Sequence, residues 1–311
     1  MPLIKISAPD FDLAKTLDSG QVFHWQKCGN GYVGTIGERA LYVEQHDDVL
    51  KVRFGATPKP TRGTRMLPGI VAHYFALDHA LGEICDSFPA DAVMNAARDF
   101  CRGLRIMRQP KWECLATFIC SSMKQVAHIR QISLALRKRF GEQRIIDNQV
   151  VYTFPSSPRI ARASENQLRQ CKLGYRAKNL RATAQLVSSG KCDLEAWSAL
   201  SDDQLRERLC ELPGVGAKIA NCAMLFAYER LRAFPIDVWI ARVLRQQYFA
   251  RKKRITPRQL REFSRTYFGE HGGYAQQYLF HHARVSSRGS ECSGDVSSPP
   301  PVGDRRYRVR Y

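Results

Sequence analysis

The sequence lacks any run of about 18 consecutive apolar residues, so we expect no membrane-spanning helix. Its start, residues 1–6, also lacks a basic stretch followed by an apolar one, which argues against a secretory signal peptide. No C-x-x-C pair occurs among the ten cysteines, and several lie within apolar stretches, as is typical of buried thiols in a reducing compartment. We therefore expect an intracellular protein, in the cytoplasm or nucleoid of a prokaryote or in the nucleus of a eukaryote.

Acidic residues are scarce beside basic ones. The chain has 29 Asp and Glu against 48 Lys and Arg, which gives a formal net charge of +19. Such an excess attracts polyanions and supplies the salt-dependent part of nucleic-acid binding. An acidic membrane surface is a weaker candidate partner, because neither an amphipathic basic helix nor a lipidation signal is evident. The 311 residues suffice for roughly two domains with a substantial core.

The period of the apolar residues changes along the chain. Before about Phe54, short β-rich runs separated by Gly, Asn and Asp turns predict an antiparallel sheet. These runs cover residues 22–25, 31–36, 40–43 and 49–54. After about Ile70 a helical period takes over. The predicted helices cover 112–120, 126–140, 176–188, 203–210, 217–229, 237–248, 257–267 and 271–283.

We therefore predict an α+β fold in which an N-terminal antiparallel sheet packs on a mostly helical region. The predicted divisions are a sheet domain with flanking helices at 1–105, a helical domain at 106–285 and a tail at 286–311. The tail is rich in Ser, Pro and Arg, a composition that predicts disorder. A basic run at 251–254 precedes the helix at 257–267 and predicts a solvated loop or a DNA contact.

A glycine hairpin at 212–218, with the sequence LPGVGAK, predicts two helices joined by a tight turn. Backbone N–H groups exposed at Gly214, Val215 and Gly216 can bind a phosphate at the positive end of the second helix. The same dipole disfavours a charged ammonium at Lys218, so the amine is closer to its nucleophilic neutral form. Asp237 follows nineteen residues after this lysine and adds a carboxylate.

These residue types suit the removal of a base from DNA. Loss of a purine passes through an oxocarbenium-like sugar, which the Asp237 carboxylate would stabilise. The Lys218 amine would attack C1′ and form a Schiff base, from which β-elimination nicks the strand. Simpler interpretations stay open: the hairpin and Lys218 could only bind phosphates, and Asp237 could be a helix N-cap.

An enzyme of this kind must flip its target base into a pocket with an aromatic face and a polar group that reads the base edge. Gln276 and Phe280 are four residues apart, hence on one helical face, and could supply both. The alternative interpretation of this pair is one core residue and one surface residue.

The hairpin, Lys218 and Asp237 together resemble the helix–hairpin–helix (HhH-GPD) DNA glycosylases that carry a catalytic lysine, specifically the 8-oxoguanine DNA glycosylases. Further segments match that family in order, at residues 19–25, 74–78, 113–122, 173–178 and 272–280. The resemblance implies a monomeric bifunctional glycosylase and AP lyase, with a TBP-like N-terminal sheet, that excises 8-oxoguanine from double-stranded DNA in base-excision repair. It implies no metal and no organic cofactor.

The resemblance also implies roles for single residues at the base. The Gly20 carbonyl would accept a hydrogen bond from the N7 hydrogen that 8-oxoguanine has and guanine lacks. Cys222 and Phe280 would sandwich the flipped base, and Gln276 would read its Watson–Crick edge. Ordinary turn formation at Gly20 and ordinary helix packing at Cys222 are the alternatives.

Other implied roles concern the DNA around the base. Tyr175 would wedge beside the orphaned partner base, and Arg176 would hydrogen-bond to it. Four further DNA contacts fall at positions that depart from the better-known eukaryotic members. Lys124 and Gln125 stand at positions of asparagines, His128 at that of an arginine, and Trp239 at that of a phosphate-binding histidine.

A fifth departure is Ala283, which replaces an aspartate. The departures leave Lys218 and Asp237 in place. They argue against a strict preference for cytosine opposite the lesion and indicate a divergent or prokaryotic branch.

Three other functions share parts of this pattern. A glycosylase for oxidised pyrimidines usually has four closely spaced C-terminal cysteines for an iron–sulfur cluster, and here only Cys292 follows Cys222. A glycosylase for alkylated bases would not need Lys218. A non-catalytic helix–hairpin–helix protein that binds DNA would keep every phosphate-binding feature, and loss of strand cleavage with retained binding would identify it.

Overall fold

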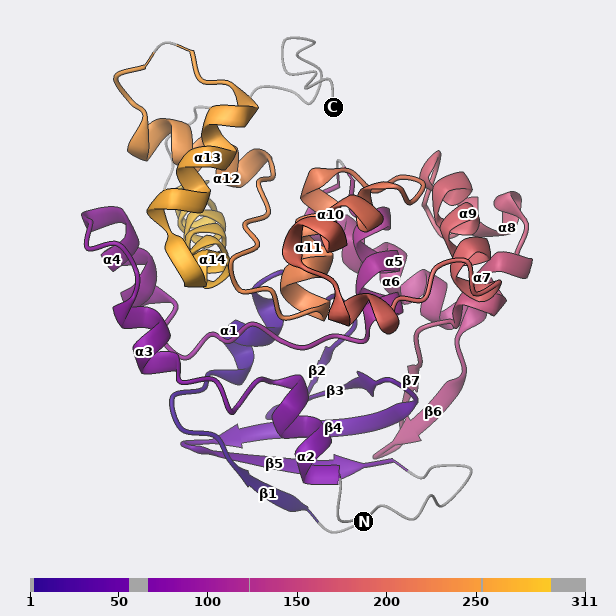
Figure 1. Cartoon of the computed structure of the whole chain (residues 1–311). Helices are drawn as coiled ribbons and strands as arrows, with labels where there is room; N and C mark the ends of the chain where they lie inside the picture. Colours follow the sequence, from indigo (N-terminus) through magenta and orange to yellow (C-terminus); the bar gives the residue numbers. More distant parts are fainter. Residues whose placement is uncertain (1–2, 56–66, 123, 253, 292–311) are drawn as a thin grey trace.

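The computed structural model describes residues 3–55, 67–122, 124–252 and 254–291. A five-stranded antiparallel sheet forms one end of this part of the molecule, and helices form most of the remainder (Figure 1). The arrangement confirms the predicted α+β fold. In the described residues, no helix is long and apolar enough to cross a membrane.

Three strands of the sheet follow predicted runs, whereas its first two strands lie outside them. Its strands are β1 (Ile4–Ser7), β2 (Gln26–Cys28), β3 (Gly31–Ile36), β4 (Arg39–His46) and β5 (Val49–Phe54), in the order β1-β5-β4-β3-β2. Burial alternates along β5, where Leu50, Val52 and Phe54 point into the core. The chain therefore buries one face of this strand, as its alternating sequence predicts.

The prediction of a strand at 22–25 is wrong. These residues are buried but unpaired, and β2 begins only at Gln26. Val22 and Trp25 enter the core beneath the sheet, whereas Phe23 enters the core of the helical region. A segment that fills two cores is as apolar as a strand, so its composition gave the wrong prediction.

A second, two-stranded sheet was not predicted. It consists of β6 (Gln143–Ile146) and β7 (Gln149–Tyr152), joined at Asp147 and Asn148, whose φ angles are +48° and +59°. Two consecutive positive φ angles are typical of the type I′ turn that closes hairpins. Ile146 and Val151 pack on Val33 of the large sheet, so this hairpin joins the sheet to the helical region.

The eight predicted helices occur close to their ranges, and the described residues form six further helices for which no range was predicted. Together they are α1 (Leu13–Asp18), α2 (Leu67–Tyr74), α3 (Leu81–Asp86), α4 (Ala92–Phe100), α5 (Lys111–Cys120), α6 (Val126–Phe140), α7 (Ser157–Arg162), α8 (Glu165–Arg169), α9 (Arg176–Ser188), α10 (Asp202–Cys210), α11 (Ala217–Ala227), α12 (Val238–Val243), α13 (Pro257–Tyr267) and α14 (Gly272–Glu291), with short turns η2 (Ala196–Ala199), η3 (Leu244–Tyr248) and η4 (Gly269–His271).

Two helix ends differ from the prediction in an informative way. Helix α11 stops at Ala227 because Glu229 takes a positive φ of +57°, a conformation that ends a helix. Helix α14 continues to Glu291, so the predicted tail is wrong for its first residues. Residues 292–311 of that tail lie outside the described residues.

Buried residues of α3 and α4, such as Ile84 and Met94, belong to the same hydrophobic core as the helices after residue 105. Helix α14 packs on α4. The helical core therefore draws on both sides of the predicted division at 105/106, which stays a prediction.

Candidate active site

The glycine hairpin joins α10 to α11. Gly214 has a φ of +81°, and a Cβ added there would lie 2.7 Å from the Asn179 Cβ of α9, so only glycine fits. The buried Val215 closes the turn through its N–H, which donates to the Leu212 carbonyl at 3.0 Å. Gly216 is the N-cap of α11. The predicted hairpin is thus present, with its N–H groups at the start of a helix.

Lys218 lies in the first turn of α11 and is half-buried. Its Nζ donates to the Ser121 hydroxyl at 3.1 Å and lies 5.1 Å from the centre of the Phe118 ring. The Ser121 hydroxyl itself donates to the Phe118 carbonyl at 2.7 Å, which leaves its lone pairs for the amine. Sequence reasoning gave Ser121 no role, because its contact with Lys218 spans 97 residues.

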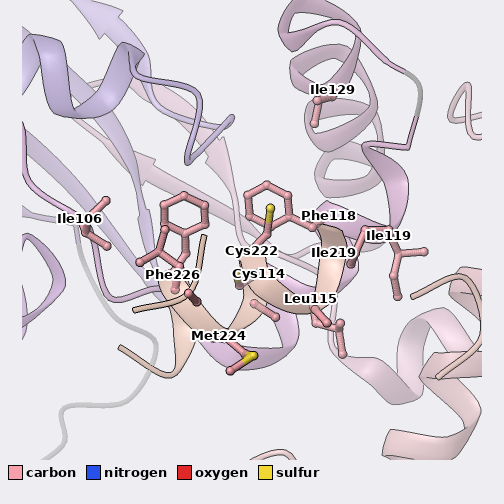
Figure 2. Packing of buried hydrophobic residues seen from close by; sticks show 14 of the residues in the cluster. Ile106, Cys114, Leu115, Phe118, Ile119, Ile129, Ile219, Cys222, Met224 and Phe226 are labelled. Atoms are coloured by element: carbon pink, nitrogen blue, oxygen red, sulfur yellow. The ribbon is translucent and has the colours of Figure 1, made fainter. Parts of the chain in front are cut away.

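Helices α5 and α11, which carry Phe118 and Lys218, bury their facing sides against each other (Figure 2). Phe118 of α5 stacks on Phe226 of α11, with ring centres 5.4 Å apart and planes 12° from parallel. Cys114 and Cys222 are both buried in the same core. The nucleophile candidate therefore projects from a rigid pair of helices rather than from a loop.

Asp237 is the N-cap of α12, and its carboxylate accepts a hydrogen bond from the Ile240 N–H at 2.8 Å. Burial raises the pKa of Asp237 above its ordinary value, against the opposing effects of this hydrogen bond and of the Lys218 charge. The N-cap interpretation is confirmed. It leaves the carboxylate close enough to Lys218 to interact with it electrostatically.

Cys222 lies one turn after Lys218 on α11 and is 3% exposed. Burial raises the pKa of its thiol to about 11, although the nearby Lys218 charge opposes this shift. The side chain is therefore a neutral thiol at physiological pH, and it suits packing against a base rather than nucleophilic attack.

The residues predicted to read the base lie on α14 and on the turn after α1. Gln276 and Phe280 are both buried, and a Cβ added at Gly20 would lie 3.1 Å from Phe280 Cε1. The buried Gln276 Oε1 accepts no hydrogen bond from any described residue. A buried acceptor without a partner is costly unless a ligand satisfies it, so the placement of this oxygen is compatible with the predicted base contact, which stays a prediction.

The predicted DNA-binding residues outside the hairpin lie at the starts of three helices, α6, α9 and α12. Tyr175 is 60% exposed beside α9, and Lys124, Gln125 and His128 are exposed at the start of α6. Trp239 lies half-buried in the first turn of α12. Met123, which also departs from the family pattern, lies outside the described residues.

Arg176 is placed differently from its neighbours. It is buried, and its guanidinium donates to the Ser122 carbonyl at 2.8 Å and to the Leu173 carbonyl at 3.2 Å. Its carbon Cζ also lies 4.3 Å from the centre of the Tyr175 ring. Arg176 thus holds the turn that carries Ser121, and a contact with an orphaned base would require it to exchange partners.

In the described residues, no group of three or more His, Cys, Asp and Glu side chains lies close enough to hold a metal ion. The chemistry that this site offers is that of an amine, a carboxylate and unpartnered acceptors.

Comparison with known proteins identifies the chain. Residues 3–115 match the model of the N-terminal domain of 8-oxoguanine DNA glycosylase, and residues 116–269 match that of the HhH-GPD superfamily of base excision DNA repair proteins. The structure of MBOgg1 in complex with a low-affinity DNA ligand is 30% identical, with a TM-score of 0.84. That match covers 92% of this chain and 97% of the other. The chain belongs to the 8-oxoguanine DNA glycosylase family.

Two further relatives show how far the 8-oxoguanine DNA glycosylase family match extends. The 8-oxoguanine glycosylase/lyase of Clostridium acetobutylicum, in complex with double-stranded DNA containing cytosine opposite 8-oxoguanine, is 28% identical with a TM-score of 0.83. The match covers 92% of this chain and all of that one (100%). A probable N-glycosylase/DNA lyase of Methanothermobacter thermautotrophicus is 28% identical, over 91% of this chain and 96% of the relative.

Proposed function

We propose that this chain is a bifunctional DNA glycosylase and AP lyase that excises 8-oxoguanine from double-stranded DNA and nicks the strand by β-elimination. The observation that carries the proposal is the Lys218 amine at the start of α11, held by Ser121 at 3.1 Å and close to the Asp237 carboxylate. The N-terminal family match favours this substrate over oxidised pyrimidines or alkylated bases, and over DNA binding without catalysis.

The excision step follows from these two groups. As the C1′–N9 bond breaks, the base leaves with the electron pair and takes up a proton, while positive charge develops on the sugar. The ionised Asp237 stabilises that charge, and its partial burial strengthens the effect because it reduces screening by water. Once Lys218 has given up a proton, its Nζ lone pair forms the C1′–Nζ bond.

The nicking step uses the same lysine. Loss of a proton from Nζ and opening of the C1′–O4′ bond, with a proton added to O4′, give the Schiff base. The iminium acidifies the hydrogens on C2′, so removal of one of them expels the 3′ phosphate. A carboxylate alone could support hydrolysis by water, but only an amine allows this covalent route.

Recognition of the base rests on two open acceptors. No described residue donates to the Gly20 carbonyl, and Gln276 Oε1 has no described partner either. 8-Oxoguanine carries an N7–H for the first acceptor and Watson–Crick N–H groups for the second. Unmodified guanine would place the N7 lone pair against the Gly20 carbonyl, which is repulsive. Phe280 and Cys222 would cover the two faces of the base.

DNA binding would use the hairpin N–H groups of Gly214 and Gly216 on a phosphate, with Tyr175 beside the orphaned base. The predicted phosphate contact of Val215 is not available, because its N–H donates to the Leu212 carbonyl. Lys124, Gln125, His128 and Trp239 would contact the surrounding strand. Because no arginine occupies position 128, we expect a weak preference for cytosine opposite the lesion.

We also expect a monomer that acts on cellular DNA, in the cytoplasm or nucleoid of a prokaryote or in the nucleus of a eukaryote. Light scattering of the free protein and of its DNA complex tests the first point. A complex that contains two protein chains per duplex would contradict it.

Borohydride trapping on a duplex with one 8-oxoguanine opposite cytosine tests the proposed function. The wild type should give a covalent adduct, and Lys218→Gln should give none. Lys191→Gln, which removes an exposed lysine just after α9, is the matched control and should trap as well as the wild type. Tight binding of this duplex by the wild type without any adduct would favour a role in binding alone.

A further inference from the structure

Two side chains of α14 hold the turn that carries Gly20, because each donates to a backbone carbonyl of that turn. Gln277 Nε2 donates to the Ser19 carbonyl at 2.9 Å, and the Arg284 guanidinium donates to the Asp18 carbonyl. Both side chains are buried, Gln277 with 2% of its surface exposed and Arg284 with 8%. These contacts join positions 258 and 266 residues apart in the chain, so they are set by the tertiary fold.

The other side of the same turn is held by Gln21, which is fully buried. Its side chain donates to the Arg105 carbonyl at 2.8 Å and accepts from the Met107 N–H at 2.8 Å. Its own carbonyl accepts from Gln109 Nε2 at 2.8 Å. Among the four backbone carbonyls of the turn 18–21, that of Gly20 is therefore the one to which no described residue donates.

A glycine at this place needs such support. The φ of Gly20 is +89°, which glycine adopts readily, and glycine also allows the following peptide group to turn over. If it did so, the N–H of Gln21 would face the base in place of the Gly20 carbonyl. That N–H complements the N7 lone pair of unmodified guanine, so a reversed peptide would reverse the selectivity.

We propose that Gln277 and Arg284 are positioning residues that fix the direction of the Gly20 carbonyl and thereby set the preference for an oxidised purine. This inference rests on the proposed function, in which that carbonyl accepts from N7–H. Neither residue needs to touch the base. Selectivity is then controlled from α14 through the backbone of a distant turn.

The neighbouring glutamines of α14 provide a matched pair for the test. Gln276 Oε1 is buried without a described partner, whereas the Gln277 amide already donates to the Ser19 carbonyl. Successive residues of a helix project about 100° apart, so the two side chains point into different surroundings. Methionine has a similar length and no donor, so Gln276→Met and Gln277→Met separate base contact from turn positioning.

The first measurement is amide hydrogen exchange of residues 18–21 in the free protein. We expect exchange to accelerate about tenfold in Gln277→Met and in Arg284→Met, because each loses one anchor of the turn. Gln276→Met should exchange at the wild-type rate. Exchange at the wild-type rate in both anchor variants would overturn the proposed positioning, and no DNA substrate is needed to see it.

The second measurement compares three single-turnover rates in each variant: excision of 8-oxoguanine, excision of guanine at the same site, and cleavage at a preformed abasic site. In Gln277→Met the preference for 8-oxoguanine over guanine should fall about tenfold, with abasic-site cleavage within about twofold of the wild type. A loss of structure would lower all three rates together.

Accelerated exchange with an unchanged preference would overturn the role in selectivity. If the wild type fails to excise 8-oxoguanine yet cleaves abasic sites, the proposed substrate and the role in selectivity both fall, while the exchange result still decides whether the turn is held as described.

Discussion

The amine of Lys218 donates to the Ser121 hydroxyl, which donates onward to the Phe118 carbonyl. Removing this hydroxyl should leave the amine free to rotate among its side-chain conformers. We expect Ser121→Ala to lower the rate of Schiff-base formation about fivefold to tenfold, the effect of one lost hydrogen bond.

Rapid-quench borohydride trapping measures that rate. Ser122→Ala is the control, because Ser122 contacts Arg176 through its backbone carbonyl, which the substitution keeps. Equal trapping rates in Ser121→Ala and the wild type would contradict the positioning of Lys218 by Ser121.

Asp237 is the N-cap of α12 and, in the proposed function, the group that stabilises positive charge on the sugar. Only the second of these functions needs an ionised carboxylate. Because burial raises its pKa above that of the unfolded chain, its ionisation above that pKa costs folding free energy. Asparagine keeps the N-cap and removes the charge. We expect Asp237→Asn to be at least as stable as the wild type at pH 7 and to lose most excision activity.

Asp237→Ala should be less stable than Asp237→Asn by about 1 kcal/mol, because it also loses the cap. Urea denaturation at pH 7 measures the free energy of unfolding of both variants. Below the ordinary pKa of an aspartate the stability gain of the asparagine variant should vanish, since the wild-type carboxyl is then protonated in both states. Persistence of the gain at that pH would contradict this account.

The sequence identified the residues that carry the chemistry but not those that hold them. Lys218 and Asp237 are recognisable from residue type and spacing, which are local properties. Ser121 looks no different from Ser122, and Gln277 no different from Gln276, because only the tertiary fold decides which of each pair meets a partner.

Among the elements, α13 begins and ends where the sequence predicts. Its start is marked by a capping box of Thr256 and Gln259, and Pro257 occupies its first position, so the signals lie within four residues. The β6–β7 hairpin has no such signal beyond Asp147 and Asn148. Its strands have four residues each and leave Ile145 57% exposed, so burial does not alternate in the usual way.

The segment from α12 into α13 concentrates positive charge. Residues 238–261 contain eight Lys and Arg and no Asp or Glu. Arg251, Lys252 and Arg254 are exposed, and none forms an ion pair with a described carboxylate. Because this segment follows Asp237 directly, we expect it to contact phosphates beside the lesion.

Replacing Arg251, Lys252 and Arg254 by Gln should weaken binding of lesion-free duplex and lower the slope of log K against log salt by about 2 to 3, from three lost phosphate contacts. Arg206→Gln with Arg208→Gln is the control on α10, where both arginines pair with carboxylates. Fluorescence anisotropy across a salt series measures the affinity and its salt dependence in the variant and in the control. An unchanged slope would place this segment away from the DNA.

Across the whole molecule, several histidines are held neutral by the fold. Burial lowers the pKa of His24 well below its ordinary value of 6.5, and the nearby Arg137 charge lowers it further. Burial likewise lowers the pKa of His281 to about 4. As the pH falls below about 6.5 the unfolded chain gains protons that the folded chain cannot take, so stability must fall.

We therefore expect the free energy of unfolding to decrease between pH 7.5 and pH 5.5, with His281 responsible for about 1 kcal/mol. Urea denaturation at the two pH values measures the change. His281→Asn should flatten the dependence. A dependence as steep as that of the wild type, or steeper, would refute the assignment.

The segment at 19–25 sends Phe23 into the helical core and Val22 and Trp25 into the core under the sheet. It also carries Gly20, whereas Lys218 belongs to a helix far along the chain. Gly20 and the α14 side chains that hold its turn therefore lie at opposite ends of the gene. We expect a chimaera that takes its first hundred residues from a relative to keep the lyase, but to keep a preference for the lesion only if the relative's turn still meets Gln277 and Arg284.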